Sequence, residues 1–275
     1  MKSFVPRLVA VDLDGTLLNS ARQVTREACD AIAHARKRGA KVIPCSGRHF
    51  AGTRAVAIQA RMGDAIICGN GSLVATWYGE VISEKMLDPQ RCIELLKFCE
   101  SYHLSSNLYA NDVLYTCGPN SVTRYYEGLN RRLALAERCV CRFVPDLVPV
   151  VYENAEKILK LEIFPLPDEP REVLLKMLNA CGDMAAEGNL RTSVELHASG
   201  VNKGTGLADA ANYYGIPLEQ TLAVGDAEND VPLLAKAGWG AAMGNAVEAA
   251  KLAADEMIPT NDENGVAWLI HKYLD

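Results

Sequence analysis

Two acidic motifs lie far apart in the chain, and both combine carboxylates with glycine. The first reads DLDGT from Asp12, and the second reads GDAEND from Gly225. Carboxylates two positions apart at a strand end can converge on one hard cation, and Mg²⁺ prefers oxygen ligands. Each motif also has a plainer interpretation, as an Asp-Gly turn or as a helix N-cap whose acids the helix dipole favours. Together the motifs predict a divalent-cation site if the fold brings them to one place.

Two further features could bind an anion such as phosphate. Ser46-Gly47-Arg48 supplies a hydroxyl and neighbouring backbone N–H groups, and Gly47 permits a close approach to the backbone. Lys203 opens a predicted helix, where the dipole disfavours a cation, so an anionic partner is indicated there. An ordinary turn and a solvated surface lysine are the alternative interpretations of these two features.

Short apolar segments precede these motifs and alternate with helical patterns. This alternation predicts an α/β fold with parallel strands and crossover helices. Ligands of such sheets bind beyond the carboxyl ends of the strands, which is where Asp12, Asp14, Ser46 and Asn70 fall. The predicted strands are 7–13, 41–44, 64–68, 220–224 and 240–243, and the predicted helices are 25–37, 53–62, 203–214, 231–237, 248–253 and 266–273.

The middle of the chain has a different pattern. Alternating runs rich in Tyr, Val and Leu predict antiparallel strands at 107–117, 157–164 and 191–197, next to helices at 89–102 and 171–180. We therefore predict that residues 1–83 and 197–275 form one sheet domain. Residues 84–196 are predicted to be an inserted α+β domain.

Composition excludes several classes of protein. Of the 275 residues, 49% are hydrophobic and 23% are charged, which is typical of a folded globular chain. The net charge of −6 and the absence of a basic stripe argue against nucleic-acid binding. Because a net acidic protein repels an anionic substrate, a phosphate site would need positive charge close by. No apolar run reaches the roughly 18 to 20 residues that span a bilayer, and no signal peptide is evident. Nine dispersed cysteines without a CxxC pair predict a reducing, cytoplasmic location.

The order of the four motifs, DxDGT, SGR, Lys and GDxxND, resembles that of the haloacid dehalogenase (HAD) superfamily of aspartyl-phosphate phosphatases. The chain looks most like the Cof-type (class IIB) branch. That resemblance implies a Rossmann-like parallel-sheet core with an inserted α+β cap of the C2 type. It covers about residues 7–82 and 198–275, and is supported by Asn70-Gly71, by AAMGNA from Ala241 and by TNDENGV from Thr260.

The resemblance implies a role for each motif residue. Asp12 is the expected nucleophile, and Asp14 the expected general acid and base. Asp12, Asp226 and the Asp14 backbone carbonyl would bind Mg²⁺, with Asp230 supporting the metal waters or Lys203. The expected phosphate-binding residues are Ser46, Gly47, Lys203 and Asn229, and the candidates for substrate contact are Arg48 and Asn70.

The predicted function is Mg²⁺-dependent hydrolysis of a small phosphorylated metabolite, either a sugar phosphate or a cofactor phosphate. A phosphomutase or phosphotransferase on the same core is one alternative. A non-catalytic protein that binds a phosphorylated ligand is another. The catalytic motifs specify neither the leaving group nor the oligomeric state.

Overall fold

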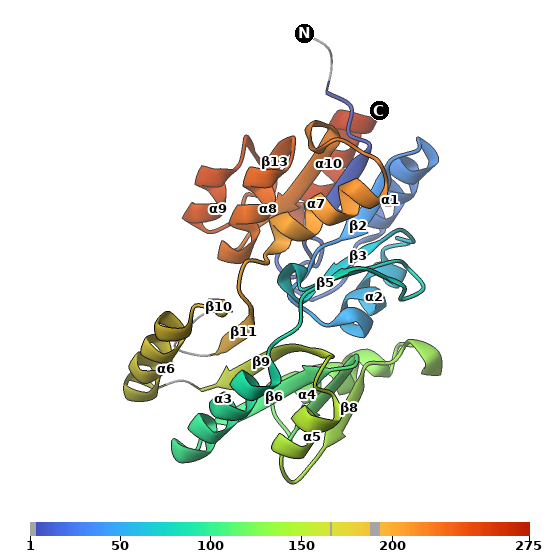
Figure 1. The fold of residues 1–275 in the computed structure, drawn as a ribbon. Coiled ribbons are helices and arrows are strands. Elements are labelled where there is room, and N and C mark those ends of the chain that lie inside the picture. Colours follow the sequence, from blue (N-terminus) through green and yellow to red (C-terminus); the bar gives the residue numbers. More distant parts are fainter. Residues whose placement is uncertain (1–3, 166, 188–192) are drawn as a thin grey trace. The chain divides into compact units, whose positions relative to one another are not determined.

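The computed structural model describes residues 4–165, 167–187 and 193–275. The chain divides into two compact units (Figure 1), Met1–Glu84 with Asn202–Asp275, and Lys85–Val201. Strand β11 (Val194–Ala198) pairs with strands of the second unit and therefore belongs to it. The chain returns to the first unit after this strand, at Asn202.

The first unit contains a parallel sheet of five strands in the order β14-β13-β12-β1-β2. Residues of β1 are fully buried, as expected for a strand covered on both faces. Val11 of β1 lies beside Val224 of β12, so the two strands end at the same edge. The strands are β1 (Leu8–Val11), β2 (Lys41–Pro44), β12 (Thr221–Gly225), β13 (Trp239–Met243) and β14 (Glu256–Ile258).

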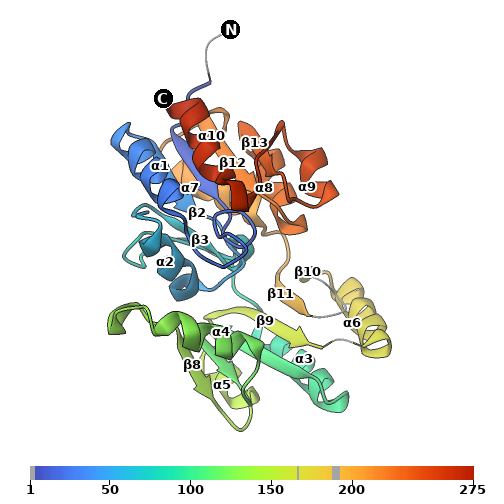
Figure 2. The same cartoon turned by 180° about the vertical axis from the view of Figure 1, so that it is seen from behind.

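Helices cover both faces of this sheet (Figures 1 and 2). Helices α1 and α10 pack together on one face, and α7 and α8 pack together on the other. Thr25 caps α1 as its sequence predicts, since its side chain accepts a hydrogen bond from the Ala28 N–H. The helices are α1 (Arg26–Lys37), α2 (Phe50–Gln59), α7 (Lys203–Tyr213), α8 (Val231–Lys236), α9 (Glu248–Ala253) and α10 (Gly265–Leu274).

The segment after α2 differs from the prediction. The strand expected at 64–68 as a further parallel strand is β3 (Ile66–Cys68), which joins the core sheet through an isolated parallel bridge from Ile67 to Cys45. The 3₁₀ turn η1 (Gly69–Gly71) reverses the chain. β3 then forms an antiparallel sheet with two unpredicted strands, β4 (Leu73–Ala75) and β5 (Val81–Glu84).

The second unit is an α+β domain with its own hydrophobic core and a six-stranded sheet in the order β10-β11-β9-β6-β7-β8. Its pairings are antiparallel as predicted, except that β7 and β8 run parallel, because helix α4 lies between them in the chain and provides a crossover. Residues 191 and 192 of the predicted strand 191–197 lie outside the described residues. The other elements are α3 (Pro89–Ser101), β6 (Ser105–Ala110), β7 (Val113–Thr116), α4 (Ser121–Asn130), β8 (Val140–Phe143), α5 (Val148–Glu153), β9 (Ile158–Phe164), α6 (Asp168–Cys181) and β10 (Met184–Glu187).

Two further observations concern the cysteines and the helices of the described residues. None of the nine cysteines, all of which lie within the described residues, forms a disulfide. Within residues 4–165, 167–187 and 193–275, every helix is too short or too polar to cross a bilayer.

Candidate active site

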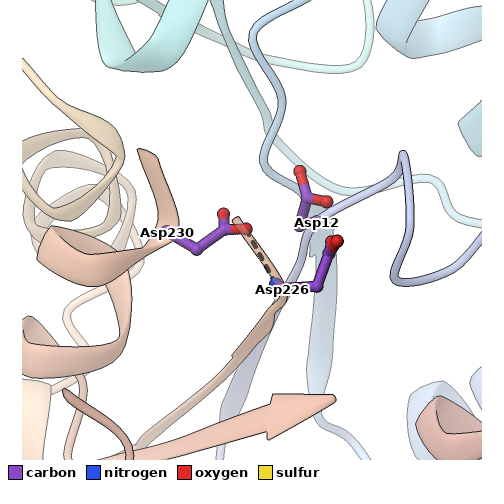
Figure 3. Close-up of side chains that lie close together, drawn as sticks. All are labelled: Asp12, Asp226 and Asp230. Carbon is purple, nitrogen blue, oxygen red and sulfur yellow. Dashed lines mark hydrogen bonds between the residues drawn. The ribbon is translucent and has the colours of Figure 1, made fainter. Parts of the chain in front are cut away.

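Three aspartates from the two acidic motifs meet at the carboxyl edge of the core sheet (Figure 3). Asp12 follows β1, and its N–H donates to the Val224 carbonyl at 3.0 Å, which places it next to the loop after β12. One carboxylate oxygen from each of Asp12, Asp226 and Asp230 lies within 4.8 Å of the others. Residues more than two hundred positions apart thus form one acidic cluster.

Lys203 lies inside this cluster. Its Nζ donates to Asp12 Oδ1 and to Asp230 Oδ1, both at 2.6 Å, and its side chain is only 1% exposed. The lysine is therefore a buried partner of two carboxylates rather than a solvated surface residue.

Helix α7 holds Lys203 in the cluster because the helix backbone packs closely against neighbouring segments of the core. Asn202 caps the helix by accepting a hydrogen bond from the Thr205 N–H at 3.0 Å. A Cβ on Gly204 would lie 2.3 Å from the Pro232 carbonyl oxygen, and one on Gly206 would lie 2.6 Å from Ile67. Larger residues at these two positions would push α7, and Lys203 with it, away from the cluster.

Asp230 is fully buried and organises the loop that carries Asp226. Its Oδ2 accepts hydrogen bonds from the Asp226 and Ala227 N–H groups, at 2.9 and 3.0 Å. A Cβ on Gly225 would lie 2.4 Å from Asp230 Cγ, so the glycine makes room for this carboxylate. Protein donors thus contact both oxygens of Asp230, and Asp12 and Asp226 are better placed to bind an ion.

The cluster contains three carboxylates and one ammonium group, so a further positive charge would stabilise it. Burial, together with the charge of Asp230, raises the pKa of Asp12 well above its usual value, although Lys203 opposes this. Burial likewise raises the pKa of Asp226 to about 6, although a 2.7 Å hydrogen bond from Thr16 opposes it. Burial disfavours the charged form of Lys203, but Asp12 and Asp230 outweigh it and raise the pKa of the lysine. Three carboxylates with one ammonium group fit a divalent cation bound through oxygen.

Asp14 pairs with Arg48. Arg48 Nε and Nη2 donate to the two Asp14 oxygens at 2.7 and 2.6 Å, and the Asp14 side chain is 52% exposed. Burial tends to raise the pKa of Asp14, but the hydrogen bonds and charge of Arg48 outweigh it and lower the pKa below its usual value. Sequence reasoning suggested substrate contact for Arg48 and did not anticipate this bidentate pair.

The remaining predicted residues lie at the same edge. Ser46 follows β2, is 2% exposed, and its hydroxyl accepts a hydrogen bond from the Arg48 N–H at 3.2 Å. Its own N–H donates to Ile67, and its carbonyl accepts from the Asn70 N–H, which links it to β3 and η1. Asn70 is 1% exposed, and Asn229 Nδ2 donates to its Oδ1 at 3.2 Å. Gly47 lies between Ser46 and Arg48 in this loop.

Sequence reasoning assigned no role to several residues that shape the site. Thr16 donates to Asp226 Oδ1, and a Cβ on Gly15 would lie 2.3 Å from Asp226 Oδ2. Gly15 also has a φ of +86°, which glycine adopts without strain. Asn245 Nδ2 donates to the Gly15 carbonyl at 2.8 Å. Gly15 and Thr16 fall inside the DLDGT motif, whereas Asn245 falls inside the AAMGNA run, which was noted only as a sign of a resemblance.

Comparison with known proteins gives a consistent result. The sequence profile of the haloacid dehalogenase-like hydrolases matches residues 9–270. Phosphatase YwpJ of Bacillus subtilis is 28% identical over 98% of this chain and 100% of its own length. Pyridoxal phosphate phosphatase YbhA of Escherichia coli is 26% identical over 98% of both chains.

A solved structure described as a HAD subclass IIB sugar phosphatase has the same fold. It superimposes with a TM-score of 0.79 over 97% of this chain and 98% of its own, at 21% identity. The match extends through both compact units.

Proposed function

Because this chain belongs to the haloacid dehalogenase-like hydrolases and is a phosphatase of that family, we propose that it hydrolyses small phosphomonoesters through an aspartyl phosphate on Asp12. The recognition of a Cof-type HAD phosphatase from its four motifs is confirmed. The observation that carries the proposal is the pair of 2.6 Å contacts from buried Lys203 to Asp12 and Asp230.

In the first step, an oxygen of Asp12 attacks phosphorus, and the bond from phosphorus to the ester oxygen breaks. Asp14, protonated once Arg48 has released it, gives that proton to the ester oxygen, so a neutral alcohol leaves. In the second step, water attacks phosphorus, the Asp12–phosphorus bond breaks, and Asp14 takes a proton from the water. Orthophosphate is released, and both aspartates return to their starting states.

Asp12 and phosphate are both anionic, so their approach needs positive charge. Lys203 supplies one positive charge in direct contact with Asp12. The proposed Mg²⁺ ligands are Asp12, Asp226 and the Asp14 carbonyl, and a bound divalent ion would offset charge on the phosphoryl oxygens. Burial strengthens these interactions relative to water.

Other groups of the edge hold the phosphoryl group and orient the acid. We propose that Ser46, Gly47, Asn229 and Lys203 contact the phosphoryl oxygens. Arg48 and Asn70 stay candidates for contact with the leaving group. Arg48 is bonded to Asp14, so the arginine must exchange this partner when Asp14 carries its proton to the leaving oxygen.

We propose that residues 84–196 act as a cap that excludes water and selects the leaving group. Sugar phosphates are the first expected substrate class, in line with the class IIB neighbour, and cofactor phosphates are the second, in line with the pyridoxal phosphate phosphatase. Nine dispersed cysteines without a disulfide suit the cytoplasmic location that we propose.

A panel of phosphate esters tests the proposal. The wild-type protein is expected to release orthophosphate with Mg²⁺ and to stop when EDTA is added. Asp12→Asn is expected to abolish turnover while leaving the fold intact. Retained turnover in this variant would remove the nucleophile assignment. Turnover that requires a sugar bisphosphate would favour the phosphomutase, and binding without turnover across the panel would favour a non-catalytic protein.

A further inference from the structure

Two asparagines near the C-terminal end of the chain hold the loop that follows Asp12. Asn245 Nδ2 donates to the Gly15 carbonyl at 2.8 Å, and Asn261 Nδ2 donates to the Leu18 carbonyl at 2.9 Å. The two asparagines are also joined, because Asn245 Oδ1 accepts from the Asn261 N–H at 3.0 Å. The loop of Asp14, Gly15 and Leu18 is thus attached to a second part of the chain at successive points.

Further bonds extend this attachment on both sides. The Ser20 N–H and hydroxyl both donate to the Asp262 carboxylate, at 2.9 and 2.6 Å. The Val247 N–H donates to the Asp226 carbonyl at 2.8 Å. The segment from 245 to 262 therefore contacts the loop after β1 and the loop after β12, the two loops that carry the metal-site carboxylates.

The position of Gly15 matters because it lies directly against Asp226. A Cβ on Gly15 would lie only 2.3 Å from Asp226 Oδ2, so little space lies between them. Thr16, the next residue, donates to the other oxygen of Asp226 at 2.7 Å. A shift of the loop would therefore move the Asp226 carboxylate relative to Asp12.

We propose that Asn245 and Asn261 are positioning residues for the metal site. By holding the Gly15 and Leu18 carbonyls, they keep Thr16 and Gly15 against Asp226, and so set the spacing at which Asp226 and Asp12 receive a divalent cation. The part of the proposal that concerns the cation depends on the proposed function, whereas the part that concerns the loop does not.

Asn245→Ala and Asn261→Ala test this, with Asn154→Ala as the matched control. Asn154 Nδ2 also donates to a backbone carbonyl, that of Val150 at 2.9 Å, but in the second unit. Calorimetric titration with MgCl₂ alone is expected to show affinity about fivefold weaker in Asn261→Ala, the effect of one lost hydrogen bond, and at least about fivefold weaker in Asn245→Ala, which loses two. Affinities within twofold of wild type in both, or an equal loss in Asn154→Ala, would overturn the proposal for the cation.

Amide hydrogen exchange of the metal-free protein tests the loop separately. The N–H groups of Leu17 and Leu18 donate to the carbonyls of Asp12 and Leu13, and they report opening of this loop. Their exchange is expected to be about fivefold faster in Asn261→Ala, at least about fivefold faster in Asn245→Ala, and unchanged in Asn154→Ala. Unchanged rates in the first two variants would refute the attachment. A wild-type protein that binds no Mg²⁺ would refute the proposed function and leave this exchange result to decide the loop.

Discussion

Replacing Lys203 with methionine is the sharpest test of the buried cluster. Methionine has a similar length but no charge, so Lys203→Met removes two hydrogen bonds to carboxylates and leaves the packing of the stem nearly intact. Breaking a buried ion pair costs about 3–5 kcal/mol. About 2–4 °C is expected for each kcal/mol in a protein of this size, so the unfolding midpoint should fall by roughly 6–20 °C at pH 8.

The loss of folding stability in Lys203→Met should be smaller at pH 5 than at pH 8, because of the titration of Asp12. Its pKa is already raised in the folded wild-type protein, and it rises further once Lys203 is gone. A carboxylate with a raised folded-state pKa favours folding at low pH, and that contribution is lost as the pH rises through the folded-state value. The destabilisation by Lys203→Met relative to wild type should therefore grow from pH 5 to pH 8.

Two assays measure these effects: thermal unfolding in EDTA at both pH values, and kcat/KM for p-nitrophenyl phosphate. Because an electrostatic group in direct contact with the nucleophile is lost, kcat/KM should fall by about 10²–10³. Lys41→Met is the control, since its ion pair with Asp64 at 3.0 Å belongs to the same unit and is partly exposed. A Lys203→Met protein that keeps the wild-type unfolding midpoint, with kcat/KM within threefold of wild type, would refute the claim that Lys203 stabilises the buried carboxylates of Asp12 and Asp230.

Three further predictions follow from the geometry. Mg²⁺ affinity should rise with pH through about 6, because burial raises the pKa of Asp226 to about 6 and the residue binds a cation when deprotonated; calorimetry showing a flat profile from pH 5 to 8 would contradict this. Arg48→Ala should lose at least tenfold more kcat with alkyl phosphates than with p-nitrophenyl phosphate, since the poor leaving groups need Asp14 oriented as an acid; equal losses would assign Arg48 to phosphate binding instead. Gly71→Ala should lower stability by at least about 2 kcal/mol, because Gly71 has a φ of +94° and a Cβ there would lie 2.2 Å from the Asn202 carbonyl oxygen; an unchanged unfolding midpoint would contradict it.

The family and the fold class could be predicted from sequence because the chemistry lies at strand ends. Short apolar runs before Asp12 and Gly225 mark buried parallel strands, and such strands end at one edge of the sheet. Both predictions are confirmed. The same argument brings Lys203 to this edge, since its helix precedes β12 in the chain. The roles assigned to these residues stay predictions.

Other features could not be predicted, because they depend on contacts without a periodic pattern. The bonds from Asn245 and Asn261 join loops more than two hundred residues apart, and no hydrophobic repeat marks either loop. Helix α2 begins at Phe50 rather than at the predicted residue 53. It ends at Gln59 rather than at the predicted residue 62, because Arg61 adopts a φ of +59° that ends the helix. The pairing of Arg48 with Asp14 depends on side-chain direction, which strand and helix patterns leave open.

The capped start of α7 has a consequence for how the insert could be exchanged. The chain leaves the core after Glu84 and re-enters it at Asn202, and the proposed catalytic residues all lie outside the insert. Asn202 is held by its capping box with Thr205 and by the close approach of Gly71, all within the core. A lid of different sequence, and so of different substrate preference, could be grafted between these two points while Lys203 keeps its place.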